Sequence, residues 1–248
     1  MGRVIKGWQI VASYVEGRLH EQRRIGCQDR VSYYRKDGKY CVALADGAGF
    51  SDYSQKGAQI VAKNICRYIV RNFDKLVSKK EENIKEVVKE AILRLLSATA
   101  KAEGIEIRLL ASTLLCVAFN KNEFLSLHMG DGVIGVLRKE EVLPFSLPDN
   151  DEFVNVTCFT TSSNFERNLR VSKGKLDDIQ GFILMSDGTA EALYHRKKQE
   201  FALAVKKIFN WFGRYDCKMI KKALDINLGK MIRNFTYDDC SIIVVKRI

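Results

Sequence analysis

Four short acidic turns, each beside an apolar run, constrain the fold of this chain more than any other feature. They are Ala45-Asp46-Gly47-Ala48-Gly49, Met129-Gly130-Asp131-Gly132, Met185-Ser186-Asp187-Gly188 and Tyr237-Asp238-Asp239-Cys240-Ser241. A carboxylate at the edge of a buried strand is costly unless it is paired or binds a cation. Because these aspartates come from distant parts of the sequence, they indicate a shared site for hard divalent ions. Oxygen ligands favour Mg²⁺, Mn²⁺ or Ca²⁺ over zinc.

The length and composition of the chain predict one domain that covers residues 1–248. The 248 residues are 46% hydrophobic, which is enough for one substantial core or two small ones. No linker rich in proline, glycine and serine divides the sequence, and Pro144 and Pro148 lie close together in its middle.

The sequence favours a cytoplasmic protein without a membrane segment. Its first residues lack the apolar core of a signal peptide, and no apolar run is long enough to span a bilayer. The seven cysteines are an odd number without metal-ligand spacing. Cys41, Cys116 and Cys240 lie in or beside strand-like runs, which is typical of buried free thiols in a reducing compartment.

The formal net charge of +11 allows two interpretations. The basic clusters at residues 67–71, 75–80, 196–198 and 218–222 could bind an anionic partner such as nucleic acid. They could also be solvated helix faces. We prefer the second interpretation, because the clusters lack interleaved aromatic residues and any nucleic-acid-binding motif. Nucleic acid is therefore not an expected partner, and we expect a monomer.

The hydrophobic pattern predicts clustered strands and helices. Strands are expected at residues 8–14, 31–35, 39–44, 112–119, 123–128, 133–138, 181–185 and 240–245, and the three from 112 to 138 read as a meander. Helices are expected from residues 51–54 to residue 73, and at 82–102, 200–212 and 218–232. Residues 146–175 read as polar and irregular. Clustered rather than alternating elements indicate an α+β fold, with helices on antiparallel sheets.

The acidic turns also have the chemistry of a two-metal centre. Two neighbouring ions need bridging carboxylates and backbone carbonyls, and such a pair activates water and neutralises a transferring phosphoryl group. Glycine after aspartate allows the backbone to approach closely and to adopt an unusual φ. Asp46-Gly47 suits this role, and Asp187 and Asp238 could supply further carboxylates. A single Asp-Gly pair usually means only a turn, so the inference depends on four turns in this order.

At this point the chain resembles the metal-dependent protein phosphatase (PPM) family, the type 2C serine/threonine phosphatases, and in particular its bacterial-type members. The resemblance covers nearly the whole chain and depends on six motifs in the family's order. They read Gly26-Cys27-Gln28-Asp29, Leu44-Ala45-Asp46-Gly47, Ala111-Ser112-Thr113-Leu114-Leu115, Gly130-Asp131-Gly132, Ser186-Asp187-Gly188 and Asp238-Asp239-Cys240-Ser241. The set is specific, although its single members are not.

The resemblance implies a four-layer α-β-β-α sandwich, in which helix pairs flank two central antiparallel sheets. It also implies two Mg²⁺ or Mn²⁺ ions. Asp46 would bridge both ions, the Gly47 carbonyl would bind the second, and Asp187 and Asp238 would hold the first. Asp131, with Asp187, matches the position associated with a third, weaker ion. Arg24 lies where the family places a phosphate-binding arginine, whose guanidinium can grip two phosphate oxygens.

The chain departs from the family pattern at several positions. Gln28 replaces a metal-linked glutamate, so the second ion would lose a charge or rely more on Asp29 and water. Ala48 stands where many members carry a histidine that acts as general acid, and His20 is the candidate substitute. Asp239 replaces an asparagine, as in other bacterial-type members. The short segment between the second and third acidic turns indicates a reduced substrate-binding flap.

Several residues near the motifs also have structural interpretations. Asp29 could cap a helix or pair with an arginine. Ser112 and Thr113 fit strand hydrogen bonding better than nucleophilic attack, because no motif places a histidine base beside them. His128 fits a hydrogen-bonded core residue better than a metal ligand.

These residues predict a metal-dependent phosphatase that acts on phosphoserine and phosphothreonine in proteins. The alternative is a weakly active or inactive phosphatase-like module that binds a phosphoprotein, an idea motivated by Gln28 and Ala48. A third hypothesis, nucleic-acid binding, rests only on the positive charge and predicts salt-steep association with DNA or RNA.

Overall fold

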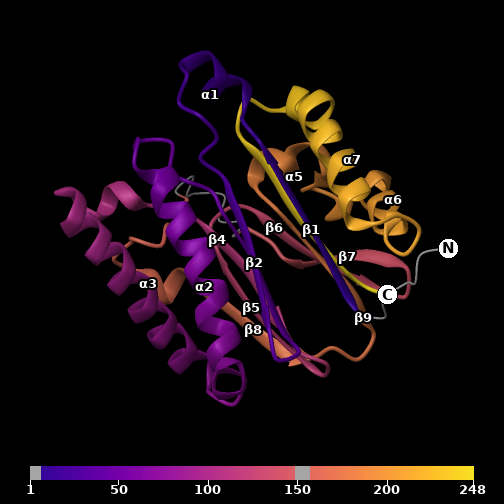
Figure 1. Cartoon of the computed structure of the whole chain (residues 1–248), viewed down its shortest axis with the longest axis horizontal. Coiled ribbons are helices and arrows are strands. Elements are labelled where there is room, and N and C mark those ends of the chain that lie inside the picture. The colour runs from indigo at the N-terminus through magenta and orange to yellow at the C-terminus, as the bar shows by residue number, and fades with distance from the viewer. Residues whose placement is uncertain (1–6, 149–156) are drawn as a thin grey trace. The chain divides into compact units, whose positions relative to one another are not determined.

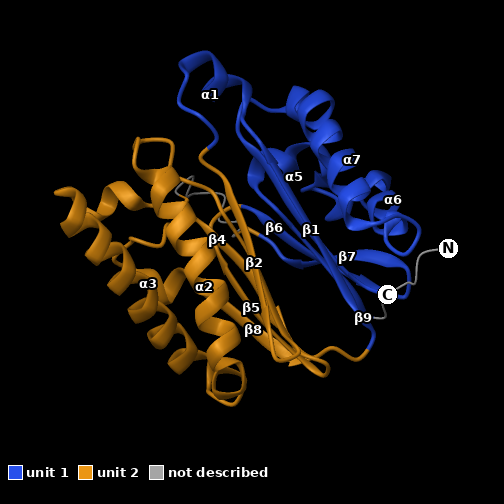
Figure 2. Ribbon diagram, in the orientation of Figure 1, with its two compact units in different colours: residues 1–27, 132–147, 178–248 blue, residues 28–131, 148–177 orange. Residues whose placement is uncertain are grey.

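The computed structural model describes residues 7–148 and 157–248. By its contacts the chain divides into two compact units, coloured separately in Figure 2. Unit 1 comprises residues 1–27, 132–147 and 178–248, and unit 2 comprises residues 28–131 and 148–177. The chain therefore passes between the units several times. The expectation of one domain over residues 1–248 stays a prediction.

Unit 2 contains a five-stranded antiparallel sheet in the order β2-β3-β4-β5-β8. Its strands are β2 (Arg30–Lys36), β3 (Lys39–Ala45), β4 (Leu114–Phe119), β5 (Glu123–Met129) and β8 (Arg170–Lys175). The β2–β3 hairpin turns at Asp37 and Gly38, both with positive φ, as an Asp-Gly hairpin requires. Every residue of β4 is buried, which explains its uninterrupted apolar sequence.

The described part of unit 2 also contains two long helices and two short ones, and Figure 1 labels the long ones. They are α2 (Ser54–Val77), α3 (Glu81–Glu103), the 3₁₀ helix η1 (Ile107–Leu110) and α4 (Phe165–Asn168). Helix α2 packs on β2, β3 and β4, and α3 lies against α2. The buried residues of α2 recur at three- and four-residue intervals, so one face of the helix enters the core. Before the helix, the Ser51 hydroxyl accepts a hydrogen bond from the Tyr53 N–H (3.1 Å).

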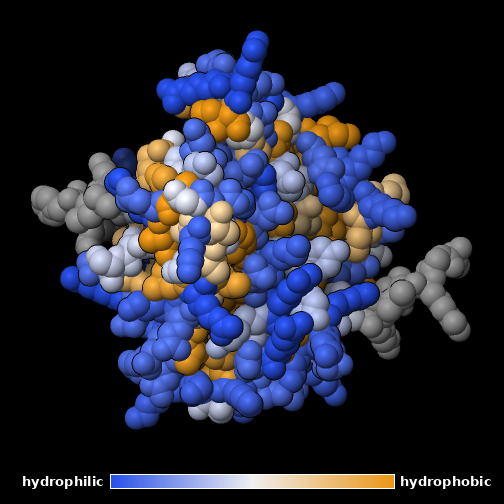
Figure 3. All heavy atoms as spheres, turned by 60° about the vertical axis from the view of Figure 1, so that its left-hand side comes forward, coloured by the Kyte–Doolittle hydropathy of each residue, from blue (hydrophilic) through white to orange (hydrophobic). Residues whose placement is uncertain are grey.

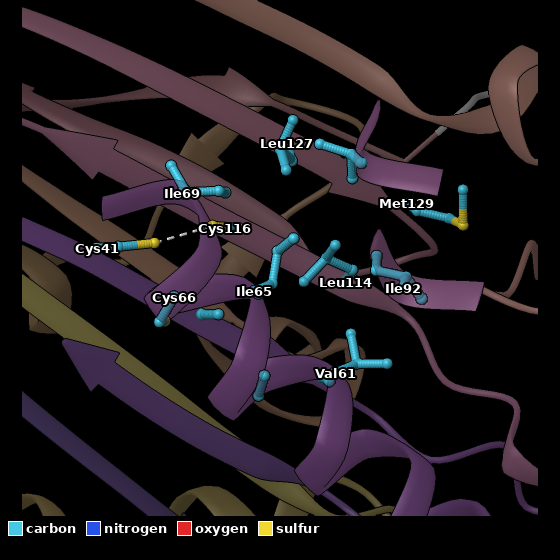
Figure 4. Close-up of a cluster of buried hydrophobic side chains, with 14 of the residues drawn as sticks. Cys41, Val61, Ile65, Cys66, Ile69, Ile92, Leu114, Cys116, Leu127 and Met129 are labelled. Atoms are coloured by element: carbon cyan, nitrogen blue, oxygen red, sulfur yellow. Dashed lines mark hydrogen bonds between the residues drawn. The ribbon is translucent and has the colours of Figure 1, made fainter. Parts of the chain in front are cut away.

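Figure 4 shows the core between α2 and the sheet of unit 2, where three thiols lie among aliphatic side chains. Cys41 on β3 and Cys116 on β4 have their sulfur atoms 3.3 Å apart and share a hydrogen bond. Burial raises the pKa of the Cys41 thiol well above its ordinary value, and burial also raises the pKa of the Cys66 thiol. These are neutral packing groups. The expectation that Cys41, Cys116 and Cys240 are buried free thiols is confirmed.

Unit 1 contains a second five-stranded antiparallel sheet, in the order β1-β12-β9-β6-β7. Its strands are β1 (Trp8–Val15), β12 (Cys240–Arg247), β9 (Ile179–Met185), β6 (Val133–Arg138) and β7 (Glu141–Ser146). Strand β7 lies at an edge of this sheet, which suits Pro144 because proline cannot donate to a neighbouring strand. A two-stranded ribbon of β10 (Tyr194–His195) and β11 (Glu200–Phe201) follows β9 in the chain.

The helices of unit 1 lie mostly in the last third of the sequence. They are α1 (Arg18–Arg23), α5 (Asp187–Leu193), α6 (Leu203–Trp211), α7 (Cys217–Lys230) and the 3₁₀ helix η2 (Ile232–Phe235). Helix α7 packs on β1, and α5 contacts β12 and β9. The Asp216 side chain caps α7 by accepting a hydrogen bond from the Met219 N–H (2.9 Å).

The expected α+β class, with two antiparallel sheets flanked by helices, is confirmed. The helices expected at residues 82–102 and 218–232, and the helix expected to start at 51–54, are also present with small shifts.

The expected meander of residues 112–138 is wrong in its last strand. Strand β5 pairs with β4 and β8, so both of its edges are already occupied, and β6 pairs with β7 and β9 in unit 1 instead. The stretch of residues 146–175 is also less irregular than expected, because it contains α4 and β8. Strand β8 is largely polar, since it is an edge strand whose last three residues are exposed.

No helix in the described ranges combines the length and the apolar character that crossing a bilayer requires. On the face drawn in Figure 3, hydrophilic residues predominate and hydrophobic ones form small separate patches.

The close contact between α2 and η1 generates a stability prediction. A Cβ atom at Gly57 in α2 would lie 2.0 Å from the Leu110 carbonyl oxygen, so Gly57→Ala must separate the helix from η1. We expect this variant to lower the free energy of unfolding by about 2 kcal/mol, although alanine is the better helix former. Chemical denaturation followed by circular dichroism measures the change.

The control is Gly229→Ala in α7, where the added Cβ would meet only ordinary contact at 3.9 Å. It should leave stability unchanged or raise it by up to about 1 kcal/mol, because alanine is the better helix former and meets no clash there. Equal effects in both helices would show that the α2–η1 contact does not require glycine.

Candidate functional site

The first acidic turn, in unit 2, is held by hydrogen bonds to the segment before β4. The Asp46 N–H donates to Thr113 Oγ1 (2.9 Å), and the Asp46 carbonyl accepts from the Thr113 N–H (2.8 Å). Gly47 forms a β-bridge with Ser112, and the Ala48 N–H donates to the Ala111 carbonyl (3.0 Å). These bonds fix Asp46 directly after β3. Ser112 and Thr113 therefore serve strand hydrogen bonding, as expected.

Gly47 is required by close packing. A Cβ atom there would lie 2.9 Å from the backbone carbon of Ser54 and 3.0 Å from its hydroxyl oxygen, so the start of α2 leaves no space for a side chain. The φ angle of Gly47 is outside the left-handed region. Of the two reasons for glycine after aspartate, only the close approach applies here.

The second acidic turn lies at the end of β5, also in unit 2. Gly130 has φ of 112°, and a Cβ there would lie 2.5 Å from Thr113 Cγ2. The Asp131 carboxylate accepts a hydrogen bond from the Thr157 hydroxyl (2.7 Å). Carboxylate oxygens of Asp46 and Asp131 lie within 4.8 Å of each other. Two like charges at this distance favour a cation near them.

His128 supports the second turn from inside the sheet. Its side chain is buried, and Nε2 lies 3.2 Å from the Gly130 carbonyl oxygen. Burial, and secondly the positive charge of Arg170, lower the pKa of His128 well below its ordinary value, while the bond to Gly130 opposes them. His128 is therefore a neutral, hydrogen-bonded core residue, as expected.

The third and fourth acidic turns meet in unit 1. The Ser186 N–H donates to the Ser241 carbonyl (3.1 Å), and the Ser241 N–H donates to Ser186 Oγ (3.0 Å). Asp187 begins α5 directly after this pair. A Cβ at Gly188 would lie 2.3 Å from the Asp239 carbonyl oxygen, so the two turns pack backbone against backbone.

Asp239 is the most enclosed carboxylate of the fourth turn, with only 1% of its surface exposed. One of its oxygens accepts a hydrogen bond from the Gly17 N–H (2.6 Å), and the other lies 3.0 Å from His20 Nδ1. Asp238 beside it is exposed. His20, Asp238 and Asp239 each offer one metal-ligand atom within 4.8 Å of the others. Unit 1 thus brings His20, which lies far away in the sequence, to the Asp238-Asp239 turn.

The remaining candidates lie between α1 and β2. Gln28 and Asp29 are buried, and the Gln28 side-chain N–H donates to the Ser51 carbonyl (3.2 Å), a bond that glutamate could not make. Arg30 Nη1 donates to the backbone carbonyl of Asp29 (2.6 Å). The expectation that the Asp29 carboxylate caps a helix or pairs with an arginine stays a prediction. Arg24 is exposed and ends α1 in the left-handed conformation, with φ of 57°. This conformation costs a non-glycine residue about 1 kcal/mol or more.

Sequence reasoning missed two residues that hold candidate carboxylates. Gly17 donates to Asp239, and Thr157 donates to Asp131. Neither residue belongs to an acidic turn, and both are far from their partners along the chain, so no local pattern marks them. The expected reduced flap lies partly outside the described residues.

Comparisons with known proteins agree with this architecture. A sequence model described as protein phosphatase 2C matches residues 16–228. A bacterial serine phosphatase is 12% identical, with a TM-score of 0.67 and coverage of 97% of this chain and 98% of the other. The serine/threonine phosphatase Stp1 from Staphylococcus aureus is 11% identical, with a TM-score of 0.64 and coverage of 100% and 99%.

The catalytic domain of the serine/threonine protein phosphatase PstP, solved in complex with two manganese ions, is 16% identical. Its TM-score is 0.64, and the match covers 98% of this chain and 100% of that domain. No curated protein matches the sequence. Because the family match covers most of the chain, the protein belongs to the protein phosphatase 2C family. At these identities the solved structures establish the fold alone.

The buried neutral His128 generates a pH prediction. Its folded-state pKa is lowered, so its contribution to stability is complete above the unfolded pKa of about 6.5 and is lost as the pH falls below that value. We expect the free energy of unfolding to decrease between pH 7 and 5, with a His128 contribution of at most about 1.4 kcal/mol per pH unit. Urea unfolding at several pH values measures this slope.

His128→Gln removes the titrating group but keeps a polar side chain. It should flatten the slope in this range, whereas the same change at the exposed His195 should leave the slope as in the native chain. If His128→Gln and the native chain lose stability in parallel on acidification, His128 is not the group responsible.

Proposed function

We propose that this protein is a metal-dependent phosphatase that hydrolyses phosphoserine and phosphothreonine in proteins. The observation that carries the proposal is the pairing of Asp46 and Asp131, whose carboxylate oxygens lie within 4.8 Å of each other although they end different strands of unit 2. The backbone bonds of Asp46 and the Thr157 bond to Asp131 hold both residues in place. Membership of the protein phosphatase 2C family supports the same reading.

The donor set fits hard divalent ions. The candidate ligands are carboxylates and one backbone carbonyl, which suit Mg²⁺ or Mn²⁺. Carried over residue by residue, the family pattern assigns Asp46, Gly47, Asp187 and Asp238 to two ions and Asp131 to a third. When bound, such ions activate a water molecule and neutralise charge on the phosphoryl group. The two manganese ions in the PstP structure support this assignment.

The chain's own side chains would then bind the phosphate and handle the proton. Arg24 is exposed, and its guanidinium can make two parallel hydrogen bonds to phosphate oxygens. His20 faces Asp239 through Nδ1 at 3.0 Å. The neighbouring carboxylate would orient the ring, and a proton carried on Nε2 could then be donated during the reaction. His20 is thus our candidate for the acid that Ala48 cannot provide.

A second candidate function is a weakly active module that binds phosphoproteins. The observation that favours it is Gln28, whose amide is engaged with the Ser51 carbonyl (3.2 Å) instead of offering a carboxylate to a metal. This module would bind a phosphopeptide but bind metal weakly. Calorimetric titration with Mn²⁺ separates the two functions, because a working centre should bind with micromolar affinity or better and a degenerate one should not.

Removing single carboxylates tests the proposed enzyme. We expect Asp46→Asn and Asp187→Asn each to reduce metal-dependent hydrolysis of para-nitrophenyl phosphate and of a phosphothreonine peptide by at least about 100-fold. The physical reason is that each change removes one negative ligand without changing the size of the side chain. Rates are measured with Mn²⁺, with Mg²⁺ and with a chelator.

Asp74→Asn is the matched control, because Asp74 is exposed and pairs with Lys39 away from the acidic turns. It should retain native activity. Full activity in both Asp46→Asn and Asp187→Asn would refute the assigned roles. A folded native chain that is inactive with every metal would favour the binding module.

A further inference from the structure

Two exposed aromatic side chains precede Asp238 in unit 1. Phe235 is 72% exposed and Tyr237 is 65% exposed, whereas Thr236 between them is 3% exposed. The alternation turns both rings outward and the threonine inward. Thr236 also anchors the turn, because its hydroxyl accepts a hydrogen bond from the Asp238 N–H (3.1 Å). The rings therefore stand on a fixed backbone that leads directly into the acidic turn.

Helix α1 lies along this segment and orders it further. Arg18 Nε donates to the Thr236 carbonyl (3.0 Å), and the Leu19 N–H donates to the Tyr237 carbonyl (3.1 Å). The Arg18 guanidinium lies 4.4 Å from the centre of the Tyr237 ring, a cation–π contact. Helix α1 and the chain before β12 both belong to unit 1, which is blue in Figure 2. We call Arg18, Phe235 and Tyr237 the aromatic–arginine surface.

The same helix, α1, carries further positive charge at its C-terminal end. Arg23 and Arg24 are both exposed, and in the described part of the chain neither has a carboxylate within ion-pair distance. Arg233, in contrast, is tied to Glu21. Helix α1 and the segment before β12 thus combine apolar rings, two further guanidinium groups and a candidate metal ligand within unit 1. A ligand with one phosphate group and an apolar side chain next to it would match this combination.

We propose that the aromatic–arginine surface binds an apolar side chain of the substrate that flanks its phosphorylated residue. This inference rests on the proposed function and adds a specificity determinant to it. The rings would bury the flanking side chain at low entropic cost, because Tyr237 is already held by Arg18. Apart from Arg18, α1 and its C-cap carry two guanidinium groups, which suits the single phosphate of a protein segment better than the repeated phosphates of a nucleic acid.

The test measures binding, so it does not depend on turnover. Fluorescent peptides carry a phosphonate analogue of phosphothreonine, which the enzyme cannot cleave, with phenylalanine or glycine at each flanking position in turn. Fluorescence anisotropy gives the dissociation constant for the native chain in Mn²⁺. We expect phenylalanine at one or two positions to improve binding roughly tenfold over glycine.

Phe235→Ala and Tyr237→Ala should each reduce this preference to about twofold or less. Tyr237→Phe keeps the ring and should retain the preference. The Mn²⁺ affinity reports whether a change at Tyr237 disturbs the acidic turn. Among the described contacts none joins Phe235 to Asp238, so Phe235→Ala remains informative in that case. Leu203→Ala is the matched control, because Leu203 is 80% exposed elsewhere in unit 1.

Equal affinity for phenylalanine and glycine peptides at every position would overturn the proposal, as would a preference that survives both alanine variants. Displacement of the peptide by a short single-stranded oligonucleotide at lower concentration than by unlabelled peptide would also overturn it. A phenylalanine preference in a chain without phosphatase activity would support the surface while refuting the proposed enzyme.

Discussion

The burial of the Asp239 carboxylate is the constraint on which the candidate site of unit 1 depends. A carboxylate with 1% exposure must be compensated: one oxygen accepts a hydrogen bond from the Gly17 N–H, and His20 Nδ1 lies 3.0 Å from the other. Both partners come from the segment that begins α1, so satisfying this one charge places the helix beside the fourth acidic turn. The positions of Arg18 and Arg24 follow from the same placement.

Glycine in both units creates the space that acidic turns need. Side chains at Gly17, Gly47 or Gly188 would collide with backbone atoms of the neighbouring segment. In each case the neighbour holds or adjoins a candidate ligand or the start of a helix. Close backbone packing, more than unusual backbone angles, lets several polar turns share the edge of an apolar sheet.

The sequence predicted the features that repeat locally. The periodicity of α2 and α3, the apolar run of β4 and the aspartates after β3 and β9 are each visible in a short window. The partner of β6 was not predictable from the sequence. The Asp131-Gly132 turn looks like a hairpin between β5 and β6, but β8 pairs with that edge of β5, and β6 pairs with β9 instead. Helix α5 and strand β8 were missed, since both are short and β8 is polar. The contact of His20 with Asp239 depends on the tertiary fold.

The pairing of β1 with β12 also bears on the order in which the chain can fold. The partner of β1 is made after every other strand, with Val15 opposite Cys240. Unit 2, in contrast, draws most of its residues from the continuous stretch 28–131. During synthesis from the N-terminus, unit 2 can form its main contacts while β1 still lacks a neighbour. Unit 1 completes its sheet only after β12 leaves the ribosome. Until then β1 has no partner and β9 has one open edge, so both are open to aggregation or chaperone binding.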